Sequence, residues 1–323
     1  MVAGITVCRW RDPFPEVVPS DVVVEAFACE IPLAVQTAMT ERLPTTAWLN
    51  LEYLSAESWV PGTHGLPSPQ AALTKYFFFP GFVAGTGGLL RERDLISQRD
   101  QFQRDKIALA EFWHSLGLTS AQGDELRVSL FCYENHALPA LLQQWADNSS
   151  PVTCLVPQSV AVLALTQFFG ETSIATNSTY SSGNLRVRVI PFLRQEEYDR
   201  LLWACDVNFV RGEDSFVRAQ WAARPFVWQI YPQQADAHRI KLDAFLDLFC
   251  AGLDAASARR VRSFWQGWNG DGLAPTHWRE FMESRSDIAS QGSRWSAKLA
   301  QQPDLATALV DFTNDLLKCP VST

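Results

Sequence analysis

Phe209-Val210-Arg211-Gly212-Glu213-Asp214-Ser215-Phe216-Val217-Arg218-Ala219-Gln220 is the stretch of sequence that decides the fold. The apolar run 207–210 predicts a buried strand, and a helix is predicted after the turn. Gly212 allows a sharp turn between them, because glycine adopts backbone angles that side chains forbid. Asp214 and Ser215 are helix-capping residue types, and the amides at a helix start attract anions. The turn is therefore either an anion site or an ordinary helix cap.

Strands and helices alternate on both sides of this stretch. In the second half, strands are predicted at 127–133, 152–156, 185–191, 207–210 and 226–230, with helices at 137–146, 159–169 and 195–204. In the first half, strands are predicted at 21–27, 46–51 and 75–80, helices at 31–42 and 98–116, and a loop at 55–70; a second loop is predicted at 172–184. This alternation is typical of parallel sheets in an α/β fold. Ligands bind outside the carboxyl ends of such strands, so the position of the turn favours the anion site.

Composition and charge exclude several classes of protein. The chain has 323 residues, of which 47% are hydrophobic and 19% charged, which is typical of a globular protein of two domains. A net charge of −8 argues against nucleic acid as a partner. No apolar stretch reaches the length of about 18 residues that a membrane span needs, and the N-terminus has no signal-peptide pattern. We therefore expect a cytoplasmic protein without nucleic-acid or membrane partners.

Cysteine and histidine spacing predicts reduced thiols and no metal site. The chain contains seven cysteines, none in CxxC spacing, and five dispersed histidines. An odd, scattered set of cysteines is more typical of thiols in a cytosolic core than of disulfides or zinc ligands. The cysteines are Cys8, Cys29, Cys132, Cys154, Cys205, Cys250 and Cys319.

Aromatic and polar side chains follow three of the predicted strands in the second half. Phe131 and Tyr133 alternate onto one side near a strand end, where Tyr133 could reach a phosphate or sugar; packing against a helix is the alternative. Phe192 could stack on a nucleobase and Gln195 could read its edge, with a hydrophobic staple at a helix start as the alternative. Together with the turn at 211–215, these groups suit a nucleotide diphosphate.

Several strings in the chain are long and distinctive: Asp21–Glu30, Trp48–Glu57, His64–Pro69, Leu73–Phe82, Gly87–Glu92, and the opening stretch continued through Trp228. In these strings the chain resembles the EarP family, the protein-arginine rhamnosyltransferases that modify bacterial translation elongation factor P. The resemblance covers nearly the whole chain.

The resemblance implies a fold and a reaction. The fold would be α/β of the GT-B glycosyltransferase type, with two Rossmann-like domains facing a cleft. Residues 1–123 would form the acceptor-side domain, 124–299 the nucleotide-sugar-binding domain, and 300–323 a helix that packs back on the first domain. The reaction would transfer L-rhamnose from TDP-β-L-rhamnose to an arginine of elongation factor P, with inversion and without a metal or other cofactor. The alternative is a non-catalytic module that binds a TDP-sugar or elongation factor P.

The resemblance also implies roles for particular residues. Phe192 would stack on thymine, Gln195 would read the base, and Tyr198 would line the same pocket. Phe131 and Tyr133 would lie near the sugar and the diphosphate. The diphosphate and ribose end would be formed by Arg211, Glu213, Asp214 and Ser215, with Glu213 supporting catalysis.

One departure from the family pattern affects the expected activity. The family opens with a strand, an aspartate-containing loop and a helix, and that loop supplies the catalytic base. The present sequence lacks such a stretch, so we expect an incomplete N-terminal domain, from a truncation or a misplaced start codon rather than a natural remnant. A guanidinium has a pKa above about 12 and needs a carboxylate to accept its proton. We therefore expect this chain to bind TDP and to transfer rhamnose slowly or not at all.

Overall fold

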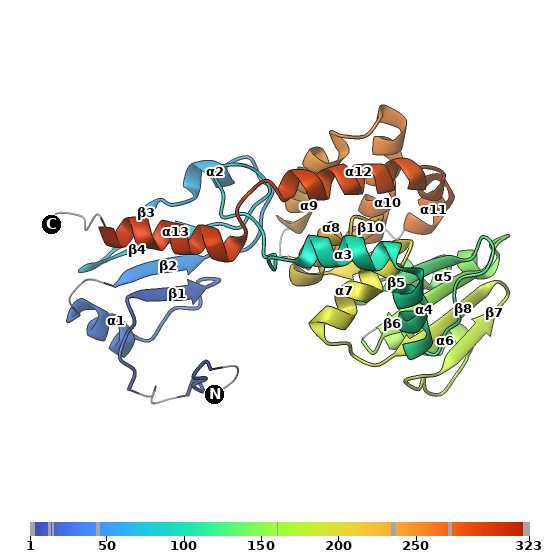
Figure 1. Cartoon of the computed structure of the whole chain (residues 1–323), viewed down its shortest axis with the longest axis horizontal. Helices are drawn as coiled ribbons and strands as arrows, with labels where there is room; N and C mark the ends of the chain where they lie inside the picture. The colour runs from blue at the N-terminus through green and yellow to red at the C-terminus, as the bar shows by residue number, and fades with distance from the viewer. Residues whose placement is uncertain are drawn as a thin grey trace. The chain divides into compact units, whose positions relative to one another are not determined.

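The chain forms two compact units, Met1–Leu90 with Gln302–Thr323 (unit 1) and Arg91–Gln301 (unit 2). The structure is a computed structural model that describes residues 4–11, 14, 16–42, 46–159, 161–233, 237–270 and 273–318 (Figure 1). Each unit contains one sheet, so the predicted α/β class with two sheets is confirmed. Residues 91–123, which the sequence placed in the first domain, belong to unit 2.

The sheet of unit 1 has four strands in the order β1-β2-β4-β3. The first three of these are parallel, and β3 runs antiparallel at the edge. Sequence reasoning missed β3 and the short helix α2, because their prolines are typical of loops. Proline lacks an N–H and is tolerated only in an edge strand, which β3 is. The elements are β1 (Val22–Ala26), α1 (Leu33–Thr40), β2 (Ala47–Leu51), α2 (Val60–Thr63), β3 (Pro67–Gln70), β4 (Leu73–Phe78) and α13 (Leu305–Lys318).

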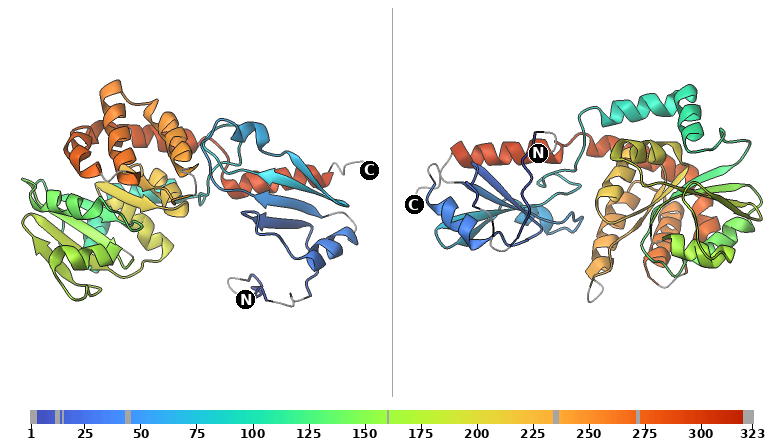
Figure 2. Two further views of the ribbon diagram at one scale, coloured as in Figure 1. Left: turned by 180° about the vertical axis from the view of Figure 1, so that it is seen from behind. Right: turned by 90° about the horizontal axis from the view of Figure 1, so that it is seen from below.

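The last helix, α13, packs on the sheet of unit 1 through Phe312. The ring centre of Phe312 lies 5.6 Å from that of Phe78 and 6.1 Å from that of Tyr76. Helix α1 covers the other face, where Met39 packs with Trp48 (Figure 2). The two helices thus bury opposite faces of one sheet.

Replacing Phe312 by alanine should detach α13. Truncating a packed phenylalanine to alanine costs about 3 kcal/mol, and the half-buried Phe312 ring contacts β4 directly. We expect faster hydrogen exchange at the amides of β2 and β4 and a lower unfolding temperature of unit 1. Val310→Ala is the matched control on the same helix, since Val310 is 53% exposed. Equal effects of the two substitutions would contradict the assigned role of Phe312.

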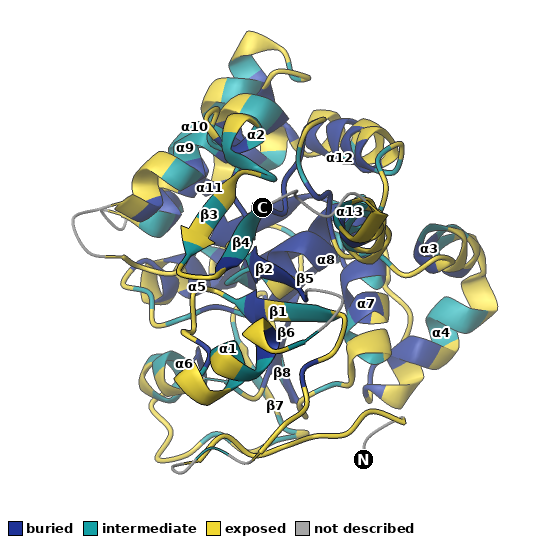
Figure 3. Cartoon of the chain, turned by 90° about the vertical axis from the view of Figure 1, so that its left-hand side faces the viewer, coloured by how far each residue is buried: buried dark blue, intermediate teal, exposed yellow. Residues whose placement is uncertain are grey.

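The sheet of unit 2 has six strands in the order β10-β9-β5-β6-β8-β7. All pair in parallel except β7, which forms an antiparallel edge with β8. Strands β5, β6 and β8 are largely buried (Figure 3). Strand β7 lies in a segment predicted to be a loop, because its polar residues face solvent at the edge. The strands are β5 (Leu126–Leu130), β6 (Val152–Pro157), β7 (Thr179–Ser182), β8 (Leu185–Ile190), β9 (Val207–Arg211) and β10 (Phe226–Gln229).

Helices pack around this sheet and supply an aromatic core. Phe245, for example, lies 4.7 Å from Phe216 and 5.9 Å from Trp265, measured between ring centres. The helices are α3 (Leu95–Arg104), α4 (Lys106–Ser115), α5 (Leu138–Ala146), α6 (Ala161–Phe169), α7 (Gln195–Ala204), α8 (Asp214–Ala222), α9 (Ala237–Cys250), α10 (Ala255–Asn269), α11 (Ala274–Glu283) and α12 (Arg285–Leu299).

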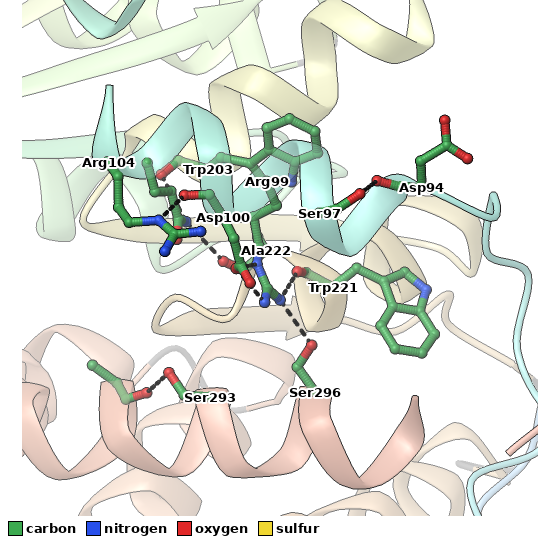
Figure 4. Close-up of polar contacts among 12 residues, drawn as sticks. Asp94, Ser97, Arg99, Asp100, Arg104, Trp203, Trp221, Ala222, Ser293 and Ser296 are labelled. Atoms are coloured by element: carbon green, nitrogen blue, oxygen red, sulfur yellow. Dashed lines mark hydrogen bonds and ion pairs between the residues drawn. The ribbon is translucent and has the colours of Figure 1, made fainter. Parts of the chain in front are cut away.

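The single helix predicted at 98–116 is two helices, α3 and α4. Asp105 is extended between them, and its carboxylate accepts hydrogen bonds from the amides of Ile107 and Ala108. An aspartate that caps the following helix in this way interrupts the preceding one. Helix α3 is tied to the end of α8 and to α12: Arg99 Nη1 donates to Trp221 O at 2.7 Å and to Ser296 Oγ at 2.9 Å (Figure 4).

Candidate functional site

The strand order of unit 2 places a binding site at the carboxyl ends of its central strands. Strand β5 has β6 on one side and β9 on the other. After β8 the chain crosses to the far side of β5, so the strand order reverses between β5 and β9. Ligands of open α/β sheets bind at such a switch point. A pocket of about 500 Å³ lies there.

The pocket brings together all nine residues predicted to bind the donor. They come from the ends of β5 and β9, from the start of α8, and from the loop and first turn of α7. Sequence reasoning assigned no role to the other three lining residues, although Pro157 ends β6 and could have been found by the same rule of strand ends. The lining residues are Phe131, Tyr133, Pro157, Phe192, Leu193, Arg194, Gln195, Tyr198, Arg211, Glu213, Asp214 and Ser215.

Arg211 is the half-buried cation of the pocket, whereas Arg194, which also lines it, is exposed and pairs with Glu197. Its guanidinium carbon lies 4.3 Å from the ring centre of Phe131 and 4.5 Å from that of Tyr133. These rings hold the side chain by cation–π contacts. Its Nε atom is buried and has no hydrogen-bond partner among the described residues. A fixed guanidinium with an unused donor suits a phosphate group.

The turn after β9 differs in one respect from its prediction. Helix α8 begins at Asp214, and the residue at its cap is Glu213, whose side chain makes no capping bond. The hydroxyl of Ser215 instead donates to Arg211 O and accepts from Arg211 N, so neither Asp214 nor Ser215 is the cap. Gly212 has a φ of +64°, and a Cβ there would lie 2.9 Å from the Tyr133 hydroxyl. The turn therefore needs glycine both for its backbone and for its contact with Tyr133.

Gln229, at the end of β10, connects the loop after β5 to the turn after β9. Its Oε1 accepts from Tyr133 N at 2.8 Å, and its Nε2 donates to Glu134 O at 3.2 Å. Its carbonyl accepts from Gly212 N at 3.2 Å. This buried side chain was not singled out from the sequence, because its partners lie in the loop after β5, about 95 residues earlier.

Aromatic rings form much of the remaining lining of the pocket. Phe192 is 76% exposed, which leaves its ring available to a ligand. The ring centres of Tyr198 and Phe131 lie 5.9 Å apart in an edge contact. Burial raises the pKa of the Tyr198 hydroxyl above its usual value, so this group stays protonated at neutral pH.

A cluster of charged side chains surrounds the buried Arg218, next to the pocket. Arg218, 3% exposed, donates to Glu92 from Nη1 at 2.6 Å and from Nη2 at 2.5 Å. Its Nη1 also donates to Asp199 Oδ2 at 3.2 Å. Burial raises the pKa of Asp199 to about 6, and the attraction of Arg218 opposes that shift. The hydrogen bond from Arg218 lowers the pKa of Glu92. The Glu92 side chain is 55% exposed, so this ion pair joins a buried guanidinium to a carboxylate at the surface.

The described part of the chain contains no group of three His, Cys, Asp or Glu side chains that could hold a metal ion. None of its helices is long and apolar enough to cross a membrane. Cys132, Cys154, Cys205 and Cys250 are buried free thiols, whereas Cys8 and Cys29 are exposed. Burial raises the pKa of Cys132 to about 12, so its thiol is unreactive. Cys319 lies outside the described residues.

Comparison with known proteins gives one consistent family. The family described as "Elongation-Factor P (EF-P) rhamnosyltransferase EarP" matches residues 1–314. The protein-arginine rhamnosyltransferase of Pseudomonas aeruginosa is 47% identical over 315 residues, which is 97% of this chain and 84% of that protein. The one from Shewanella oneidensis is 40% identical over 323 residues, which is 96% of this chain and 82% of that protein. A solved structure described as the basis for EarP-mediated arginine glycosylation of translation elongation factor EF-P superposes with a TM-score of 0.69 at 41% identity, covering 74% of this chain and 76% of that one.

Proposed function

The chain belongs to the EarP family of protein-arginine rhamnosyltransferases, which are glycosyltransferases, and from this we propose its reaction and substrates. It transfers L-rhamnose from TDP-β-L-rhamnose to an arginine side chain of translation elongation factor P, with inversion at the anomeric carbon. The reaction takes place in the cytoplasm and needs no metal ion. The observation that carries this proposal is the pocket at the switch point of unit 2, in which an exposed ring, an amide and a fixed guanidinium come together.

We place the donor along this pocket. The thymine base lies against Phe192 and within reach of Gln195, and the diphosphate lies against Arg211 and the start of α8. Stacking, a hydrogen-bonding amide and a cation are the three contacts that a pyrimidine nucleoside diphosphate requires. In this placement the Arg211 guanidinium supplies the positive charge opposite the diphosphate, so a nucleotide sugar can bind without a metal ion.

The chemistry follows from this placement. A guanidine nitrogen of the acceptor forms a bond to the anomeric carbon while the bond from that carbon to the diphosphate oxygen breaks. The acceptor proton passes to a carboxylate base, a role to which no residue of this sequence is assigned, and TDP leaves with the electron pair of the broken bond. Arg211 and the amino end of α8 stabilise the charge that develops on the diphosphate. Glu213 holds the donor at this end of the pocket in a supporting role.

Mass spectrometry of elongation factor P tests the reaction. The full chain is incubated with the factor and TDP-rhamnose, and peptides of the factor are sequenced. We expect a mass gain of one deoxyhexose on one arginine, accumulating slowly as the sequence predicts, and none on a factor in which that arginine is lysine. TDP binding without any mass gain would contradict the proposed transfer and would favour a non-catalytic binding module.

Replacing Phe192 by alanine should weaken TDP binding without destabilising the protein. Stacking of a base on an aromatic ring contributes about 1–3 kcal/mol, so the loss of affinity should be about tenfold or more. The ring is 76% exposed, so the unfolding temperature should not change. Calorimetric titration with TDP measures the effect. Ile240→Ala, which removes a 63% exposed side chain on α9, is the control and should bind like the parent. Unchanged affinity in the Phe192 variant would rule out stacking.

A further inference from the structure

Asp199 is a buried carboxylate next to the pocket that the proposed reaction does not use. It is 4% exposed and lies on α7, behind the residues that line the pocket. Its Oδ2 atom accepts from Arg218 Nη1 at 3.2 Å. Arg218 is itself held by Glu92 and lies with its Nε 4.0 Å from Asp214 Oδ1. The Asp199 carboxylate is therefore fixed in position from behind.

The second oxygen of this carboxylate lacks a hydrogen-bond donor. Asp199 Oδ1 is buried and has no partner within 3.5 Å among the described residues. Gln195 precedes it by four positions on α7, a spacing at which helical side chains meet. Because a buried acceptor favours a donor strongly, the Gln195 amide is drawn to this carboxylate.

A hydrogen bond between these two side chains fixes which way the Gln195 amide points. An ionised carboxylate only accepts hydrogen bonds, so Gln195 must turn its NH₂ group toward Asp199. Its carbonyl oxygen is then the atom presented to the pocket. A base that offers an N–H at this edge, as the 2,4-dione pyrimidines do at N3, is complementary to that oxygen. Cytosine offers an acceptor nitrogen at the same place, and two facing acceptors repel.

We propose that Asp199, fixed by Arg218, is a positioning residue that orients the Gln195 amide and so makes the pocket select a base with an N–H donor. The proposal rests on the proposed function, because that function places the base beside Gln195. It adds a residue outside the pocket that sets the choice of nucleotide.

The test compares the affinities of TDP and cytidine diphosphate by calorimetric titration of the full chain. We expect the parent to bind TDP at least tenfold more tightly. In Asp199→Asn the ratio should fall to about one, because an asparagine side chain both donates and accepts and lets Gln195 turn either way. Glu196→Gln changes an exposed carboxylate on the same helix and should leave the ratio unchanged. A ratio preserved in a folded Asp199→Asn variant would overturn the proposal. Failure of the parent to bind TDP at all would overturn the proposed function instead, and the proposal with it.

The ratio of TDP to cytidine diphosphate affinity, measured for the parent at several pH values, gives a second test. A purely structural role of Asp199 would not change this ratio. The groups that face Asp199 are Arg218 and Asp214 from α8, Glu92 from the segment before α3, and Gln195 on its own helix. Once protonated, Asp199 can donate, and the Gln195 amide is released. The ratio of TDP to cytidine diphosphate affinity should therefore fall as the pH drops through about 6, the pKa of Asp199. Both ligands carry the same diphosphate, so its own titration cancels in the ratio. A ratio independent of pH between 7 and 5 would overturn the proposal.

Discussion

Arg211→Met will weaken the binding of TDP by about 100-fold, a loss of about 3 kcal/mol. Methionine keeps an apolar side chain between the rings of Phe131 and Tyr133, so the packing of the pocket survives. What is lost is a charged donor that the rings hold in place and whose Nε is unused by the described residues. Hydrogen bonds between a guanidinium and a phosphate are among the strong ones in proteins. Calorimetric titration with TDP measures the loss.

Arg200→Met is the matched control for this experiment. Arg200 is an exposed arginine on α7 that does not line the pocket, and its replacement changes the net charge by the same amount. Its affinity for TDP should stay within about twofold of the parent at moderate ionic strength, where distant surface charges are screened. Similar losses in both variants would show that overall charge, rather than the position of Arg211, governs binding.

Arg218→Met will lower the free energy of unfolding by about 3–5 kcal/mol, because removing one partner of a buried ion pair leaves the others uncompensated. Asp199 would remain buried without its cation, and Glu92 would lose both of its hydrogen bonds from Arg218. Urea denaturation at pH 7 measures the change. Arg262→Met is the control, because Arg262 pairs with the largely exposed Asp247 and a surface pair contributes at most about 1 kcal/mol.

The loss in free energy of unfolding caused by Arg218→Met should become smaller as the pH falls. Asp199 has a folded pKa of about 6, above its usual value, so the folded state takes up a proton between pH 6 and its unfolded pKa. Once neutral, Asp199 no longer needs Arg218. Glu92, whose folded pKa is lowered, loses its own contribution as the pH falls further. A double variant with Asp199→Asn should recover part of the loss at pH 7. A deficit that stays constant from pH 7 to pH 5 would contradict this account.

The sequence predicted the pocket because its residues follow a local rule. Phe131, Phe192 and Arg211 each come at or just after the end of a parallel strand, and the strands of one sheet bring such ends together. No knowledge of distant contacts was needed for that inference. The strands β3 and β7 escaped prediction for a related reason, since edge strands carry the prolines and polar residues that are typical of loops.

The supporting contacts could not be predicted in the same way. Arg218 and Glu92 are 126 residues apart, and nothing in either local pattern indicates the partner. The same holds for Gln229, whose amide connects two loops through backbone atoms that have no sequence signature. The break between α3 and α4 depended on a local competition, in which the Asp105 carboxylate satisfies amides of the next helix better than a continuous helix would. The hydrophobic periodicity of the sequence alone does not predict where such a break occurs.

The packing of α13 on β4 has a consequence for how the protein is made. Unit 1 is built from the first 90 residues and from residues 302 onward, whereas unit 2 is one continuous segment. On the ribosome, every residue of unit 2 is therefore synthesised before α13. Domains usually fold in the order in which they emerge. Here unit 1 cannot complete its fold before unit 2 has been synthesised. Until then, the sheet face that Phe312 covers in the folded protein stays exposed. The nascent chain thus carries an exposed apolar surface through most of translation, and this is the stage at which a chaperone would matter most.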